Sequence, residues 1–202
     1  MNNQVLILGI GNVLWADEGF GVRCIEILDR NWSFPERVKL LDGGTQGLYL
    51  LPFIEESDVL LIFDAIDYGL EPGALKVVEG KEVPSFMGAR KLSLHQTGFQ
   101  EVIATAQFIG RCPNHLILVG CQPEELDDYG GGLRDVVAAQ IPLAIDIALE
   151  KLRVYGVFPE KEFSNRQLLT SSPISRDTYE GERPSTKDAC RIGDPRFFPL
   201  TE

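Results

Sequence analysis

The most apolar run of the chain is Val59-Leu60-Leu61-Ile62-Phe63-Asp64, and it ends in a carboxylate. A short, continuous apolar run of this length is typical of a strand that is buried on both faces, as in a parallel sheet. We therefore predict that it forms the central strand of an α/β fold, with Asp64 at its end.

Shorter apolar runs before and after this strand predict its neighbours in the sheet. They cover residues 5–9, 38–42 and 115–120, and a run at 74–78 after Pro72-Gly73 predicts an edge strand. Segments with helical spacing cover residues 19–30, 48–56, 99–109 and 133–155, the last with a kink or break at Pro142, and residues 79–97 are predicted to be mixed loop. Strands that alternate with helices predict a three-layer α/β sandwich with a mostly parallel, twisted central sheet of about five strands flanked by helices.

The regular pattern stops near residue 158, which divides the chain into two parts. Residues 1–158 suit one α/β domain. Residues 159–202 are dominated by Ser, Thr, Pro, Gly and charged side chains, so we predict an irregular, partly disordered C-terminal extension. Phe197 and Phe198 are the apolar pair that would dock it on the domain.

The charge of the chain limits its partners. The formal net charge is -11, which disfavours nucleic acid because phosphate binding needs a basic surface. Most of this charge lies in residues 1–158, where it suits a metal site, a basic partner, or solubility alone. No apolar run reaches the roughly 18 residues that span a membrane. The start, Met1-Asn2-Asn3-Gln4, carries no basic residue, so we expect no secretory signal and a cytoplasmic protein.

The four cysteines do not predict a redox or zinc motif, because none lies in a CxxC pair. Without a secretory signal a disulfide framework is not expected either. We predict free thiols, with Cys24 and Cys121 packed inside, and we find no histidine beside a cysteine in a catalytic pattern.

Polar residues gather where the predicted strands end, and in an open α/β sheet that edge binds ligands. The segments concerned are Gly9-Ile10-Gly11-Asn12 with Asp17-Glu18-Gly19, Asp42-Gly43-Gly44-Thr45, Asp64, and Ser93-Leu94-His95-Gln96 just before a helix. We therefore expect acidic groups and one of the two histidines to converge at one edge of the sheet.

A dinucleotide site is one interpretation of the first loop. Gly9 and Gly11 after a strand begin the pattern GxGxxG, and Asp42 could be the acid that binds ribose. However, Leu14 takes the place of the third glycine, and Glu18 near the helix start would repel phosphate. The pattern therefore disfavours NAD or FAD.

A metal site is the second interpretation. Glu18, Asp64 and His95 provide two carboxylates and one imidazole, a plausible set for a divalent transition metal that leaves coordination positions open. Each residue also has an ordinary explanation: a first-turn helix acid, a strand-end cap and a loop histidine.

The motifs in order resemble those of the maturation endopeptidases of nickel–iron hydrogenases. The first is Gly9-Ile10-Gly11-Asn12-Val13-Leu14 followed by Ala16-Asp17-Glu18-Gly19-Phe20-Gly21-Val22. The others are Leu41-Asp42-Gly43-Gly44-Thr45, Phe63-Asp64-Ala65-Ile66-Asp67, Ser93-Leu94-His95-Gln96 and Val119-Gly120-Cys121-Gln122-Pro123. The resemblance covers residues 4–156 and is greatest to the branch that serves membrane-bound uptake hydrogenases.

This resemblance implies a fold, an activity and a site. The fold would be phosphorylase/hydrolase-like, and the activity would be removal of a short C-terminal peptide from the hydrogenase large-subunit precursor after nickel insertion. Glu18, Asp64 and His95 map onto the nickel contacts, with the nickel brought by the substrate, and Asp42 maps onto a further acidic position near the site. An aspartic-type or a metal-assisted mechanism is implied, and a non-catalytic nickel-sensing chaperone of the precursor is the alternative. We expect a monomer, since the substrate is itself a large protein.

Overall fold

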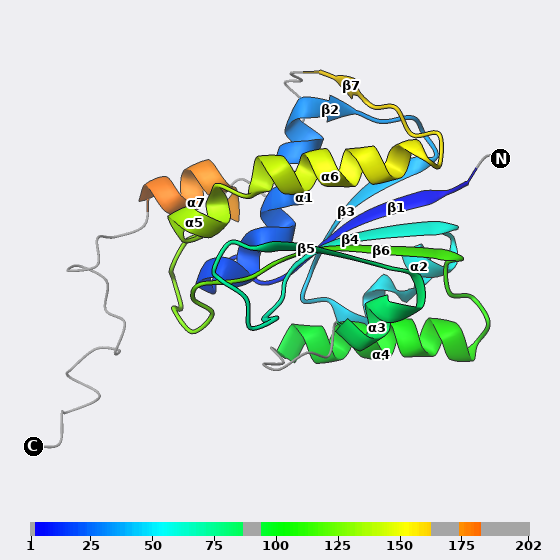
Figure 1. Cartoon of the computed structure of the whole chain (residues 1–202), viewed down its shortest axis with the longest axis horizontal. Coiled ribbons are helices and arrows are strands. Elements are labelled where there is room, and N and C mark those ends of the chain that lie inside the picture. The colour runs from blue at the N-terminus through cyan, green and yellow to red at the C-terminus, as the bar shows by residue number, and fades with distance from the viewer. Residues whose placement is uncertain (1–2, 87–93, 163–173, 183–202) are drawn as a thin grey trace, which may run out of the picture.

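The computed structural model describes residues 3–86, 94–162 and 174–182 (Figure 1). Its strands are β1 (Val5–Ile10), β2 (Trp32–Ser33), β3 (Val38–Gly44), β4 (Val59–Ala65), β5 (Leu75–Glu79), β6 (His115–Cys121) and β7 (Glu160–Lys161). Its α-helices are α1 (Phe20–Asn31), α2 (Leu51–Glu55), α3 (Val83–Phe86), α4 (Leu94–Phe108), α5 (Asp135–Ala138), α6 (Ile141–Arg153) and α7 (Arg176–Glu182). Three 3-10 turns, η1 (Ala16–Gly19), η2 (Gly47–Leu50) and η3 (Gly80–Glu82), complete the elements.

Five strands form the central sheet in the order β3-β1-β4-β6-β5. The pairs β1·β3, β1·β4 and β4·β6 are parallel, and β5 runs antiparallel to β6 at the edge. The predicted α/β class, the mostly parallel sheet, the central strand and the edge strand are therefore confirmed.

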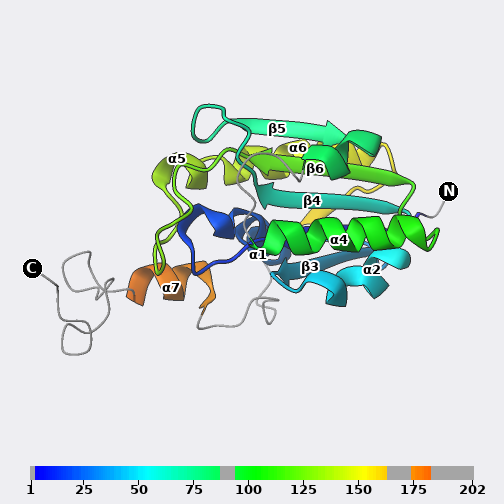
Figure 2. The same ribbon diagram turned by 90° about the horizontal axis from the view of Figure 1, so that it is seen from below.

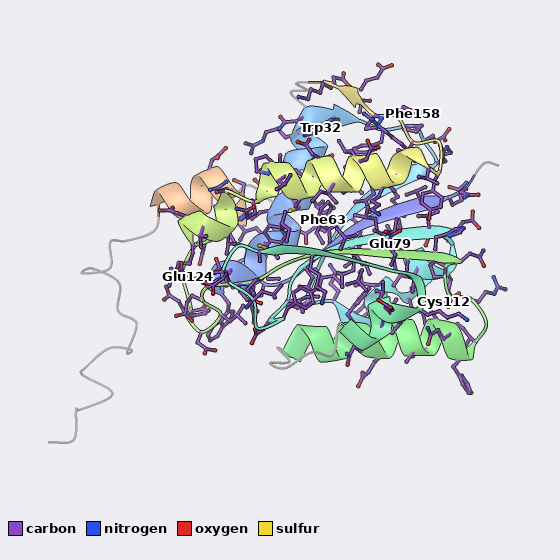
Figure 3. The ribbon with its side chains drawn as sticks, viewed as in Figure 1. Trp32, Phe63, Glu79, Cys112, Glu124 and Phe158 are labelled. Atoms are coloured by element: carbon purple, nitrogen blue, oxygen red, sulfur yellow. The ribbon has the colours of Figure 1, made fainter. Side chains whose placement is uncertain are left out.

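The central strand separates two hydrophobic cores. Leu61 and Phe63 pack with α1 and α6, whereas Leu60 and Ile62 pack with α2, α3 and α4 on the other face. Figures 1 and 2 show these helices as layers on either side of the sheet, and Figure 3 shows Phe63 between the sheet and the α1–α6 layer. Each of these four side chains is completely buried, and burial of an apolar side chain of this size contributes about 1.5–3 kcal/mol.

Helix α1 packs unusually close to the sheet because two glycines face each other. A Cβ on Gly9 would lie 2.3 Å from the Gly21 carbonyl oxygen, and a Cβ on Gly21 would lie 2.2 Å from the Phe63 carbonyl oxygen. Neither position has room for a side chain. The close packing of α1 on the sheet therefore explains the glycine at position 9. No bound phosphate is needed to account for it.

Two predicted helices and one predicted loop differ from the structure. Helix α4 begins at Leu94, and residues 80–86 of the predicted loop form η3 and α3. Residues 133–155 do not form one kinked helix but contain α5 and α6, with Pro142 in the first turn of α6. Proline is compatible with that first turn because its missing N–H would have no partner inside the helix.

The C-terminal extension contains two elements that the composition did not predict. Strand β7 pairs antiparallel with β2, and α7 contacts Glu26 and Arg30 of α1. Both are too short to produce a clear hydrophobic period. Phe197 and Phe198 lie outside the described residues, and the division of the chain at residue 158 stays a prediction.

Within the described residues, the structure contains no helix with the length and apolar character required to traverse a bilayer.

Candidate active site

Asp64 is a carboxylate at the carboxyl end of the central strand and is 0% exposed. It pairs in register with Gly120 of β6. Side chains alternate between the two faces of a strand, and Ile62 and Leu60 at alternate positions before it belong to the core beneath α4. Asp64 therefore projects from the sheet on the side of α4.

Glu18 lies in η1, directly before α1. A Cβ on Gly11 would lie 1.8 Å from the Glu18 carbonyl oxygen, so the backbone of the two loops is in close contact. Gly11 has a φ of +135°, which a residue with a side chain rarely adopts. Because η1 also contacts β4, the half-buried Glu18 is held near the carboxyl ends of β1 and β4.

The backbone of His95 lies in the first turn of α4, not in a loop before that helix. The start of α4 adjoins η2, since a Cβ on Gly98 would lie 3.7 Å from the Gly47 Cα. η2 follows the carboxyl end of β3, so α4 begins at the same edge of the sheet as Glu18 and Asp64. Among the described side chains, which do not include that of His95, no three His, Cys, Asp or Glu groups form a metal-binding cluster. The three-residue metal set stays a prediction.

Asp42 reaches the same edge but lies on the opposite face of the sheet. Val38 and Leu40, at alternate positions of β3, belong to the α1–α6 core. Asp42 pairs in register with Gly9, and its Oδ1 accepts a hydrogen bond from the Gly44 N–H at 3.0 Å. It therefore shapes its own loop beside α1, and a catalytic role for it stays a prediction.

Burial raises the pKa of the Asp42 carboxyl, and the Gly44 N–H and the Arg23 guanidinium oppose this rise. A carboxyl whose pKa is higher in the folded state favours folding most at low pH, and this contribution is lost as the pH rises through the folded pKa. We therefore expect Asp42→Asn to be at least as stable as the wild type at pH 7, with a gain that shrinks as the pH falls. Urea unfolding at pH 4 and pH 7 measures the difference, and a gain that is larger at pH 4 would contradict the assignment.

Asp17 is a buried carboxylate to which the sequence analysis gave no role. It is 0% exposed. Its Oδ2 accepts from the backbone N–H groups of Glu124 and Glu125, both at 2.9 Å, and its Oδ1 accepts from the N–H of Arg134 at 2.7 Å. One side chain thus fastens residues 124–134 to η1. Only its place beside Glu18 in the first motif could have indicated this.

The loop at residues 124–134 is joined to the loop before η1 by further contacts. The Trp15 and Tyr129 rings lie 5.2 Å apart between centroids, Gly130 N–H donates to the Leu14 carbonyl at 2.8 Å, and Ala16 N–H donates to the Gly131 carbonyl at 3.1 Å. Figure 3 shows Glu124 at the carboxyl-end edge of the sheet, far from Glu79 at the opposite end. The loop at residues 124–134, which contains Gly130-Gly131-Gly132, is thus part of the rim of the candidate site.

Tyr68 adjoins Asp64 on the α4 side of the sheet. A Cβ on Gly120 would lie 2.3 Å from Tyr68 Oη, so the phenol covers the residue that pairs with Asp64. Burial and then the charge of Asp64 raise the pKa of Tyr68. The side chain of Gln122 holds this loop, because its Oε1 accepts from the Tyr68 N–H at 2.8 Å. The phenol is therefore neutral and places an O–H group in the candidate site.

The described cysteines are free thiols, as predicted, and Cys24 and Cys121 are buried. Burial and then the charge of Asp17 raise the pKa of Cys121 to about 12. Burial also raises the pKa values of Cys24 and Cys112. A thiol in this state is a poor nucleophile near neutral pH, which disfavours these cysteines as catalytic groups.

Comparison with known proteins relates this arrangement to one group. Residues 22–151 match the family described as hydrogenase maturation protease. The hydrogenase expression/formation protein HupD of Rhodobacter capsulatus is 58% identical over 196 residues, which are 97% of this chain and 93% of that protein. The hydrogenase expression/formation protein HoxM of Cupriavidus necator is 54% identical over 199 residues, which are 97% of this chain and 98% of that protein.

A solved structure has the same fold. The hydrogenase maturating endopeptidase HybD from E. coli superposes with a TM-score of 0.74 and 38% sequence identity. The superposition covers 79% of this chain and 98% of HybD. Nearly all of HybD therefore has a counterpart here, whereas about a fifth of this chain has none in HybD.

Proposed function

The chain belongs to the hydrogenase maturation protease family and is a peptidase, and from this premise we propose that it removes the C-terminal extension of a nickel–iron hydrogenase large-subunit precursor after nickel insertion. The observation that carries the proposal is the completely buried carboxylate of Asp64 at the end of the central strand. Glu18 and the helix that carries His95 come from other elements of the same edge.

In this proposal the nickel is part of the substrate and arrives bound to the precursor. Glu18, Asp64 and His95 approach it and thereby detect that the precursor is loaded, since carboxylates and an imidazole suit nickel. A precursor without nickel lacks the bridging ion and is not positioned for cleavage. The precursor therefore keeps its C-terminal extension until the nickel is in place.

Two chemical routes fit this arrangement. In one, a carboxylate of Glu18 or Asp64 takes a proton from the attacking water as a general base. In the other, the substrate's nickel polarises the scissile carbonyl. In both routes the neutral phenol of Tyr68 lies over Gly120, the residue that pairs with Asp64.

We further propose that the hydrogenase is of the uptake type and that cleavage takes place in the cytoplasm by a monomer. The resemblance of the motifs to the branch that serves membrane-bound uptake hydrogenases supports the uptake type. The acidic chain, with a net charge of -11, suits a basic protein substrate.

His95→Ala tests the nickel-sensing part of the proposal, and His115→Ala is its matched control. The chain has only two histidines. His115 is exposed at the start of β6, where its ring lies 4.9 Å from that of Tyr155. Intact mass of nickel-loaded precursor is expected to show no processing by folded His95→Ala and normal processing by His115→Ala. Normal cleavage by the His95→Ala protein would contradict the proposal that this residue senses nickel. If the wild-type protein binds the precursor but the precursor loses no mass, the protein is instead a chaperone.

A further inference from the structure

Three loops at the carboxyl-end edge of the sheet each expose a large apolar side chain. Tyr49 in η2, which follows β3, is 84% exposed, Leu70 after β4 is 47% exposed, and Tyr129 after β6 is 62% exposed. We refer to these three side chains as the apolar rim. Single exposed apolar side chains are common on protein surfaces, so exposure alone assigns them no role. Their position and their support decide it.

Tyr129 is held in a fixed place although its ring is exposed. The ring lies 5.2 Å from that of Trp15, and the backbones of the two residues pair as an antiparallel bridge. Asp128, the residue before it, forms an ion pair with Arg134 at 2.8 Å, and the buried Asp17 binds both ends of the loop. A rigid aromatic side chain loses little conformational entropy when a partner packs on it. Tyr129 therefore has the properties of an interface contact.

Leu70 is joined to the loop of Tyr129 through Gln122. The Oε1 of this buried side chain accepts from the N–H of Tyr68 at 2.8 Å and from the N–H of Leu70 at 3.1 Å. Gln122 itself ends β6 and leads into the loop that carries Tyr129. The sequence motif at 119–123 thus holds two loops of the apolar rim together.

The apolar rim lies within the area that a substrate protein covers at the candidate site. The Glu18 N–H donates to the Trp15 carbonyl at 2.9 Å, so Tyr129 is one ring contact away from the turn of Glu18. β3, β1, β4 and β6 are consecutive neighbours in the sheet, which places the ends of β3 and β6 about 14 Å apart. A protein partner covers about 800 Å², a patch roughly 30 Å across. A protein whose scissile bond lies at Glu18 and Asp64 therefore also covers the apolar rim.

We propose that the apolar rim, Tyr49, Leu70 and Tyr129, is the docking surface for the hydrogenase large-subunit precursor and packs against apolar side chains of the precursor around the cleavage point. This inference rests on the proposed function, because the position of the scissile bond decides which protein covers the rim. The rim binds the precursor without taking part in the chemistry. Its loss therefore raises KM and leaves kcat unchanged.

The double variant Tyr49→Ser/Tyr129→Ser tests the proposal, and Phe108→Ser/Phe158→Ser is its matched control. Phe108 and Phe158 are 91% and 68% exposed, as far as the two tyrosines or slightly further. Phe108 ends α4, whose start adjoins the site, and Figure 3 shows Phe158 far from Glu124. With nickel-loaded precursor, the rim variant is expected to raise KM about tenfold, with kcat within about twofold of the wild type. The control is expected to change neither constant.

Ionic strength separates an apolar contact from a charged one. Salt screens exposed charges but does not weaken the burial of apolar surface. The ratio of the KM of the rim variant to that of the wild type is therefore expected to be the same at low and at high ionic strength. A ratio that falls toward one in high salt would overturn the apolar character of the rim.

A folded rim variant with the KM of the wild type would overturn the proposal, and so would an equal rise of KM in the control. If the loss of the Tyr129 ring lowers kcat or prevents folding, Tyr49→Ser/Leu70→Ser decides, because neither residue lies in the loop that Asp17 binds. A raised KM in that variant supports the rim, and an unchanged KM overturns it. If the wild type binds loaded precursor but cleaves none, the proposed function fails, and the Kd of the same variants then tests the rim in place of KM.

Discussion

Asp64→Asn is expected to fold normally and to process nickel-loaded precursor about 10²–10⁴-fold more slowly than the wild type, the usual contribution of a positioned acid–base group. The amide has nearly the shape of the carboxylate, so the packing around this completely buried side chain is preserved. The negative charge and the basic oxygen are both lost. Either route of cleavage requires one of them, because the carboxylate contacts the nickel or activates the water.

Asp58→Asn is the matched control for this prediction. Asp58 lies next to the same strand at its amino end, where its side chain accepts from the Gln4 N–H at 2.8 Å. We expect it to process at the wild-type rate. Rates come from the mass of the precursor over time, and circular dichroism establishes folding. A folded Asp64→Asn protein whose cleavage rate is within about threefold of the wild-type rate would contradict a role for Asp64 in the chemistry. A general acid or base contributes far more to the rate.

Asp17→Ala is expected to lower the free energy of unfolding by about 3 kcal/mol, because it leaves three N–H donors of the loop at 124–134 without their buried acceptor. Processing is expected to fall as well, since the same contacts hold η1 and therefore Glu18. Asp17 is a positioning residue, so the loss of rate should exceed what the unfolded fraction explains.

Urea unfolding measures the first effect, and precursor cleavage at a temperature where both proteins are folded measures the second. Asp127→Ala is the control, because Asp127 is an exposed carboxylate in the same loop and should change stability by less than about 0.5 kcal/mol. An Asp17→Ala protein as stable as this control would show that the loop is held by other contacts.

The centre of the sheet could be predicted from the sequence because its central strand is buried on both faces. Such a strand appears as a continuous apolar run, and Val59–Ala65, which is buried along its whole length, follows this rule. The edge strand Leu75–Glu79 is only partly buried and contains Lys76 and Glu79, and the turn residues Pro72-Gly73 before it indicated where it begins. The edge that Glu18, Asp64 and the start of α4 share also follows, since the carboxyl ends of parallel strands lie at one edge.

The two faces of that edge could not be predicted from the loops alone. Asp42 and Asp64 both end a strand, yet they project to opposite sides, because their strands flank β1 in a register that places Asp42 and Phe63 beside Gly9. One residue of register moves a side chain to the other face. Motif order carries no information on register, so Asp42 was grouped with Asp64.

The contacts of Asp17 and α7 were missed for another physical reason. Asp17 binds backbone N–H groups more than a hundred residues away in the chain. Backbone donors cannot be recognised from the residue types of a sequence. Arg23 and Glu26 of α1 bind the backbone of Ile174 and Arg176 in the same way. Helix α7 has seven residues and packs through polar contacts, so its sequence has no hydrophobic period that would predict a helix.

The most direct test of the central claim is the intact mass of hydrogenase large-subunit precursor, nickel-loaded and nickel-free, after incubation with the purified protein. We predict that only the loaded precursor loses a C-terminal peptide. Equal loss from the nickel-free precursor would contradict the nickel gate, and an intact loaded precursor in a complex with folded protein would contradict the assigned cleavage.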